Sequence, residues 1–213
     1  MTLKERMKYL FWSLVVIVMP LFYGLANYDR LPAKMAIHWG LHNKPNGFVD
    51  KPIAVFGLII LMVALQIIMM AVTWLNSLQK GAAKKFEKVT LGVIPVLTFV
   101  LYIATIMVNL GTNVNIWAVA MTLVGLIFIV LGNYMPKIPA DYNRGPGKKK
   151  WRDHPEAWKK MSRELGFVMV GGGILCIISI LLAEWVSIVA LILTVAGISY
   201  VGFRGQRYIN EAE

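Results

Sequence analysis

Two histidines, four residues apart, are the first candidates for chemistry in this chain. His38 and His42 lie in a polar stretch that is flanked by Asp29 and Asp50. On a helix this spacing places both imidazoles on one face, as in zinc hydrolases, whose motif has a glutamate beside the first histidine to activate water. Here Trp39 follows His38, so that general base is missing. A metal-dependent enzyme that uses His38 and His42 stays open as an alternative, beside a histidine that hydrogen-bonds within its own loop.

The rest of the chain shows no other group with the surroundings of a catalytic nucleophile. No serine has a base at a plausible spacing, and the single cysteine, Cys176, lies deep in an apolar run. The run Gly171-Gly172-Gly173 also lies in an apolar stretch, where small residues let helices pack closely. We therefore predict that the protein is not an enzyme and has no cofactor.

Apolar residues dominate the composition. They make up 58% of the 213 residues, and charged residues only 15%, against about 25% in a soluble domain. A helix needs about 20 apolar residues to cross a bilayer, and lipid offers the backbone no hydrogen-bond partners, so each crossing must be helical. The chain divides into a three-span region 1–110 and a three-span region 111–213. The sequence thus predicts an all-α membrane protein with six transmembrane helices, at Tyr9–Tyr28, Pro52–Gln79, Val89–Asn109, Val114–Met135, Leu165–Ala183 and Trp185–Phe203.

The positive charges predict how these spans are oriented. With the N-terminus inside, the inner segments hold 18 lysines and arginines and the outer segments hold four. Positive residues accumulate on the cytoplasmic side of membrane proteins, so we expect both termini in the cytosol and residues 29–51 outside. The net charge of +11 is then mainly topological and partly in contact with anionic lipid heads. No direct nucleic-acid partner is predicted.

The interiors of the predicted spans carry no acidic or basic residue. Pumps and proton-coupled transporters place ionisable groups at this depth, so that class is disfavoured. The mild polar residues, among them Gln66, Thr105 and Asn109, are expected to form hydrogen bonds between helices. A small transporter or lipid-handling protein that uses these three residues is a further alternative. Pro20 and Pro95 are expected to interrupt the first and third spans.

The outer segment 29–51 has the pattern of a short hairpin. Met35-Ala36-Ile37-His38-Trp39 has the apolar and aromatic character of a strand, and Phe48-Val49 suits the returning strand. Lys44-Pro45-Asn46-Gly47 is typical of a turn, because proline fixes φ and glycine allows a positive φ. We expect a small folded lid on the outer membrane face, with Trp39 and Phe48 anchored near the headgroups.

This loop resembles that of a bacterial membrane domain of unknown function, which forms the N-terminal part of the SdpI-like family. The domain typically reads LPxxIPxHWNxxGxxDGxxxK between its first two spans. At matching spacing the chain keeps Leu31-Pro32, Ile37-His38-Trp39, Gly47 and Lys51. It departs from the pattern at Met35-Ala36, Gly40, Asn43 and Asn46. The resemblance implies that His38, Trp39, Gly47 and Lys51 contact a ligand or toxin.

The inner segment 136–164 divides into two parts. Pro139 through Gly147 is rich in Pro, Gly and Asn and should be irregular. From Asp153, as the cap, the pattern predicts a short amphipathic helix that lies along the inner membrane surface and leads into span five, with Pro155 in its first turn. Trp158, Met161 and Leu165 share one face of this helix. Its basic residues suit either an anchor on anionic lipid or a docking surface for an acidic cytosolic partner.

A second resemblance to the SdpI-like family lies at the end of the fourth span, in Leu131-Gly132-Asn133-Tyr134-Met135-Pro136-Lys137. In SdpI-type proteins this span similarly ends in GNYMPK, and a cytosolic stretch with a tryptophan pair follows. The resemblance implies a multi-pass protein of the bacterial cell membrane that gives immunity to a secreted peptide toxin and tethers a cytosolic transcriptional regulator. The predicted contacts with that regulator or with lipid are Lys148, Lys149, Lys150, Trp151, Trp158, Lys159 and Lys160.

Overall fold

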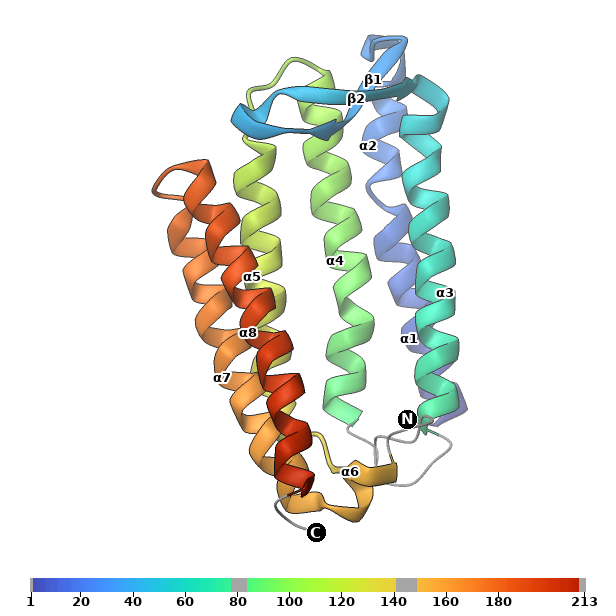
Figure 1. The fold of residues 1–213 in the computed structure, drawn as a ribbon. Helices are drawn as coiled ribbons and strands as arrows, with labels where there is room; N and C mark the ends of the chain where they lie inside the picture. The colour runs from blue at the N-terminus through green and yellow to red at the C-terminus, as the bar shows by residue number, and fades with distance from the viewer. Residues whose placement is uncertain (1, 78–83, 141–148, 211–213) are drawn as a thin grey trace. The chain divides into compact units, whose positions relative to one another are not determined.

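The computed structural model describes residues 2–77, 84–140 and 149–210 (Figure 1). Within these residues, six helical segments are long and apolar enough to cross a membrane, which confirms the predicted all-α, six-span fold. Several of them continue beyond the apolar runs into charged turns. These segments are Leu3–Ala26, Ile53–Leu75, Lys85–Asn109, Ile116–Lys137, Pro155–Ser179 and Glu184–Asn210.

Within the described residues, the spans are built mainly from seven α-helices, and one hairpin of strands lies between the first two spans. The strands are β1 (Lys34–Trp39) and β2 (Pro45–Asp50), and a π-helical turn over Ile53–Gly57 leads from them into α3. A short helix, α6 (Lys149–Asp153), precedes α7. The longer helices are α1 (Leu3–Val18), α2 (Leu21–Ala26), α3 (Leu58–Ser77), α4 (Lys84–Asn109), α5 (Ile116–Tyr134), α7 (Pro155–Ser179) and α8 (Glu184–Asn210).

The chain forms two compact units, each with its own apolar core. The first unit consists of Met1–Val72 and Thr90–Ala120, and the second of Thr73–Val89 and Met121–Glu213. The boundaries fall inside α3, α4 and α5, whereas the division predicted from sequence falls after residue 110. The core of the first unit is Ile17, Leu31, Met35, Ala54, Val55, Ile59, Tyr102 and Ile106. That of the second is Ile138, Ala140, Trp151, Ala157, Trp158, Met161, Val201, Tyr208 and Ile209.

The two prolines expected to interrupt helices behave differently. Pro20 separates α1 from α2, as predicted. Pro95 lies inside an unbroken α4, so the prediction that it interrupts the third span is wrong. A proline cannot donate to the carbonyl four residues earlier, here that of Leu91. Gln66 of α3 supplies the missing donor, because its Nε2 lies 3.1 Å from the Leu91 oxygen.

Glycines let α5 and α7 of the second unit approach closely. Gly125 faces Gly173, and Gly132 faces Gly166. A Cβ atom added to any of these four would lie between 2.5 and 3.0 Å from the carbonyl oxygen of the opposite glycine. Gly171 does not take part in this contact, because a Cβ atom added there would meet nothing within 4 Å. A Cβ atom added at Gly172 would overlap the Thr194 side chain of α8, so the packing role predicted for this glycine run is confirmed at Gly172 and Gly173.

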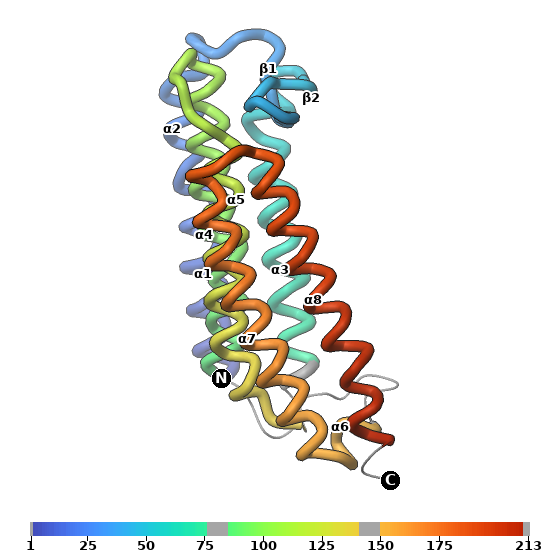
Figure 2. The backbone as a smooth tube through the Cα atoms, turned by 60° about the vertical axis from the view of Figure 1, so that its left-hand side comes forward, coloured from blue at the N-terminus to red at the C-terminus, as the bar shows by residue number. Residues whose placement is uncertain are grey.

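Helix α7 contains the helix predicted to begin near Asp153. It runs without a break from Pro155 into the fifth span and lies beside α8 (Figures 1 and 2). The helix predicted to lead into span five is therefore present as the first turns of α7. Its cap is His154, not Asp153, and makes no side-chain capping bond. The expected shared face of Trp158, Met161 and Leu165 is confirmed, because all three pack in the core of the second unit.

Candidate functional site

The predicted hairpin is present, at the end of the first unit where α4 ends and α3 begins (Figure 1). Its turn lies earlier than expected: the Gly40 amide donates to the Lys44 carbonyl at 2.9 Å, and His42 and Asn43 have φ of 60° and 54°. The turn predicted at residues 44–47 is therefore wrong, because Pro45 through Gly47 belong to β2. Asparagine and histidine tolerate this left-handed region better than most side chains, so they can form the reversal.

The strand pairing contains two irregularities, and these position His38. Ala36 pairs with Phe48, His38 with Gly47, and Trp39 with Pro45, so Ile37 and Asn46 are each an extra residue. Bulges of this kind re-aim side chains. The His38 Nδ1 lies 2.5 Å from the Asn46 Oδ1. Because an amide oxygen only accepts, the His38 Nδ1 is the donor in this contact, and Nε2 takes no part in this bond.

Gly47 allows His38 to lie opposite it. A Cβ atom added at Gly47 would lie 2.9 Å from the His38 Cβ. Real Cβ atoms do not approach each other so closely, so any other residue at this position would displace the histidine or open the strand pair. The structure therefore brings together two of the residues that the family resemblance singled out, and it assigns Gly47 a steric role.

Two asparagines connect the hairpin to the end of α4 and the start of α5. The Ala36 amide donates to the Asn109 Oδ1 at 2.8 Å, and the Asn109 Nδ2 donates to the Ala36 carbonyl at 2.9 Å. Asn43 makes a similar pair, since its Nδ2 donates to Val114 and its Oδ1 accepts from the Ile116 amide, both at 2.9 Å. Each asparagine thus pairs with the backbone as a neighbouring strand would.

Lys51 joins the far end of β2 to the end of the first span. Its Nζ donates to the Tyr28 carbonyl at 3.0 Å and lies 4.9 Å from the centre of the Tyr28 ring. The Lys51 amide also donates to the Ala33 carbonyl, at 2.9 Å. This lysine holds the base of the hairpin in place. It lies away from His38, which is nearer the tip of the hairpin.

The remaining side chains of the hairpin divide between the interior and the surface. Trp39 is half-buried, and its indole N–H is buried without a hydrogen-bond partner among the described residues. Three large apolar side chains of the hairpin are exposed: Phe48 (58%), Leu41 (53%) and Ile37 (46%). The His38 side chain is exposed as well, so the hairpin exposes one imidazole and three large apolar side chains. We refer to these four residues below as the contact surface.

The geometry gives the metal alternative no support. Among the described residues, no group of three or more His, Cys, Asp or Glu side chains is arranged to hold a metal ion. His42 lies in the turn with φ of 60°, whereas His38 lies in β1, so the two imidazoles are not on one helix face. The favoured interpretation, a His38 that hydrogen-bonds within its own loop, is confirmed by its contact with Asn46.

Two of the three polar residues of the transporter alternative, Gln66 and Asn109, form side-chain hydrogen bonds within the protein. Gln66 joins α3 to α4 through Leu91, which confirms a hydrogen bond between helices. Asn109 holds the hairpin and also donates to the Thr105 carbonyl at 2.9 Å. The Asn109 amide and the Gln66 Nε2 are thus engaged in structural contacts, whereas the Gln66 Oε1 is buried without a hydrogen-bond partner among the described residues.

The predicted inner contact residues fall into two sets. The Trp151 and Trp158 rings pack edge to face, with centroids 5.9 Å apart, and both are buried. The Trp158 Nε1 donates to the Ile138 carbonyl at 2.6 Å. Lys150, Lys159 and Lys160 are exposed. Lys148 and the side chain of Lys149 lie outside the described residues.

The asparagines are the residues that the sequence did not identify as site residues. Asn43 and Asn46 stand where the family pattern has glycine and aspartate. For Asn109 the sequence predicted only a hydrogen bond between helices. Nothing local in the sequence indicates that Asn109 pairs with Ala36, because the two are 73 positions apart. A departure from the family pattern at Asn43 and Asn46 was the available signal.

Comparisons with known proteins agree with these observations. Residues 15–63, which include the hairpin, match a family model described as a domain of unknown function, DUF1648. The immunity protein SdpI of Bacillus subtilis strain 168 is 26% identical over 183 residues, which cover 85% of this chain and 86% of that protein. No solved structure matches. The two matches confirm the resemblance to the SdpI-like family.

Proposed function

We propose that this SdpI-like, multi-pass bacterial membrane protein protects its cell against a secreted peptide toxin. The observation that carries the proposal is the similarity to an immunity protein across 85% of the chain. The six spans fit this function, since they place the protein in the membrane that such a toxin must reach. The region that matches the domain of unknown function includes the hairpin, and we place the contact with the toxin there.

Within the hairpin, we assign recognition to the contact surface. His38 presents a ring nitrogen that can accept or donate a hydrogen bond, and Ile37, Leu41 and Phe48 present apolar area. The hairpin is held at several points, so little conformational freedom is lost when a partner binds. Trp39, Gly47 and Lys51 would then act through the shape of the hairpin, by packing, by close approach to His38 and by anchoring its base.

Survival under toxin challenge tests this function. Toxin-sensitive cells that express the wild-type chain should survive the sporulation-delaying toxin, and cells with an empty vector should not. We expect His38→Ala to lower survival at least about tenfold, which corresponds to the loss of about 1.4 kcal/mol of binding. Lys44→Gln is the matched control, because it changes an exposed hairpin residue outside the contact surface and should protect normally.

Equal membrane levels of all variants, checked by immunoblot, are required for the comparison. If His38→Ala protects as well as the wild type, the contact surface is wrong. If the wild type itself gives no protection against the toxin, the immunity function is wrong. A survival assay thus separates the function from the assignment of residues.

The family resemblance also implies a tethered cytosolic regulator. The buried indoles of Trp151 and Trp158 serve the core of the second unit, so the exposed lysines would have to supply such a contact. Binding of a regulator to this region is proposed only on the resemblance. Co-purification of a cytosolic protein that depends on Lys159 and Lys160 would support it.

A further inference from the structure

A basic cleft of about 360 Å³ lies on one face of α7 in the second unit. Pockets that hold small molecules have volumes of about 300–1,000 Å³. The positions of the lining residues repeat every three or four residues, as expected for one face of a helix. The cleft is lined by Glu156, Lys159, Lys160, Arg163, Glu164 and Phe167.

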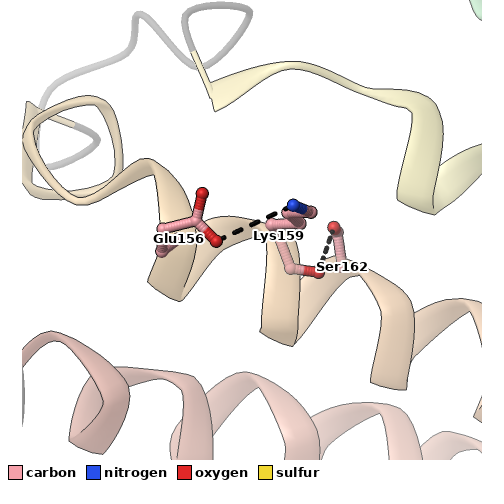
Figure 3. A network of polar contacts seen from close by, with 3 residues as sticks. All are labelled: Glu156, Lys159 and Ser162. Atoms are coloured by element: carbon pink, nitrogen blue, oxygen red, sulfur yellow. Dashed lines mark hydrogen bonds and ion pairs between the residues drawn. The ribbon is translucent and has the colours of Figure 1, made fainter.

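Both carboxylates of the basic cleft already have partners. Lys159 lies 3.8 Å from Glu156 in an exposed pair, and the Ser162 hydroxyl donates to the Lys159 carbonyl at 3.1 Å (Figure 3). Glu164 accepts from the Tyr208 hydroxyl of α8, with its two oxygens 2.7 and 2.9 Å away. The acidic side chains of the cleft are therefore engaged within the protein.

Two cations of the basic cleft lack an acidic partner. Among the described residues, neither Lys160 nor Arg163 forms an ion pair. The Lys160 Nζ lies 4.0 Å from the centre of the Tyr208 ring, and the Arg204 guanidinium lies 5.6 Å from it. The ring holds the lysine by a cation–π contact without neutralising it. The cleft thus presents positive charge that an anion can bind.

The basic cleft lies where α7 changes from charged to apolar sequence. From Leu165 to Ser179 the helix contains no charged residue. Phe167, at the apolar end of the cleft, is 71% exposed. A lipid whose phosphate contacts the cations would place its acyl chains beside this phenylalanine. A soluble acidic protein would not reach an apolar side chain at membrane depth, so it would leave Phe167 without a contact.

We propose that the basic cleft binds the headgroup of an anionic phospholipid, with Lys160 and Arg163 on the phosphate and Phe167 against the acyl chains. The cations attract anionic headgroups electrostatically, and the guanidinium of Arg163 can contact two phosphate oxygens at once. The bound lipid would hold the charged end of α7 at the membrane surface. This inference is independent of toxin immunity.

Titration of the purified full chain with phosphatidylglycerol in detergent, read by native mass spectrometry, tests the proposal. We expect one phosphatidylglycerol to bind saturably and phosphatidylcholine to bind more weakly. The double variant Lys160→Gln/Arg163→Gln should raise the dissociation constant of phosphatidylglycerol about tenfold, equal to about 1.4 kcal/mol. The variant Arg152→Gln/Arg207→Gln removes the same charge from exposed residues that do not line the cleft. We expect it to change the constant less than about twofold.

Three outcomes would overturn the proposal. Equal weakening by the two double variants would show attraction by net charge alone. Equal binding of phosphatidylcholine would remove the role of the anionic headgroup. Displacement of the lipid by glycerol 3-phosphate or by a hexaglutamate peptide at similar or lower concentrations would identify a site for soluble phosphate or for an acidic protein. Phe167→Ala supports the proposal if it weakens phosphatidylglycerol but leaves the weak binding of glycerol 3-phosphate unchanged.

Discussion

At the scale of single residues, the side chains of Asn43 and Asn109 form hydrogen bonds with backbone amides and carbonyls that a neighbouring strand would otherwise form. Ala36 is buried, and its amide and carbonyl are both bonded to the Asn109 side chain. An unpaired buried backbone group costs as much as a lost hydrogen bond. Asn109 is therefore the residue that allows β1 to pack against the end of α4.

We expect Asn109→Ala to loosen the hairpin without unfolding the spans. Losing both bonds to Ala36 costs about 1–3 kcal/mol of local stability, which corresponds to hydrogen exchange faster by about five- to more than a hundredfold in peptides that contain residues 34–39. The measurement is hydrogen–deuterium exchange by mass spectrometry of the purified protein. Asn115→Ala is the control. The Asn115 side chain accepts from the Ala118 amide at the start of α5, and this hydrogen bond does not involve the hairpin. Equal exchange in the two variants would contradict the role of Asn109.

At the scale of elements, a polar residue in one helix compensates for a proline in the next. Pro95 leaves the Leu91 carbonyl without its usual donor, and the buried Gln66 donates to it across the α3–α4 contact. Inside a membrane no water can take that place. The unbroken course of α4 therefore depends on α3, which is why the expected interruption does not occur.

A double-mutant cycle tests this compensation. Gln66→Leu should destabilise the protein by about 1 kcal/mol, a typical value for a hydrogen bond between helices in a membrane. In a Pro95→Ala background the alanine amide can itself donate to Leu91, so the cost of Gln66→Leu should fall. We expect a coupling free energy of about 0.5–1 kcal/mol, measured by reversible unfolding in mixed micelles. Additive costs would show that Gln66 and Pro95 act independently.

At the scale of the whole molecule, the six candidate spans among the described residues predict that both termini lie on one side of the membrane. The excess of positive charge on one set of connecting segments then predicts that this side is the cytosol. The proposed toxin contact requires this orientation, because a secreted toxin reaches only the outer face.

Labelling of introduced cysteines tests the orientation. The single native cysteine, Cys176, is fully buried and can be removed as Cys176→Ala. In that background, Lys44→Cys in the hairpin should react with a membrane-impermeant maleimide in intact cells. Arg152→Cys, on α6, should react only after the cells are permeabilised. The reverse pattern would invert the topology and exclude the hairpin as the toxin contact.

The sequence by itself determined the spans, the hairpin and the family resemblance. Runs of apolar residues and a short strand–turn–strand pattern are local properties, so they can be interpreted without knowing which segments meet. Local reasoning was wrong about the location of the turn, since residues 45–47 belong to β2, and about Pro95, which lies inside an unbroken α4.

The tertiary structure decided which residues meet, and hence which of them can contact a partner. Asn109 pairs with Ala36 across 73 positions and Gln66 with Leu91 across 25, separations at which no local pattern indicates contact. The same packing buries Trp151 and Trp158, for which the sequence predicted contacts with a regulator or with lipid. It also leaves Lys160 and Arg163 without acidic partners among the described residues. Hydrogen bonding and burial in the folded chain depend on neighbours distant in sequence, and for that reason they could not be predicted residue by residue.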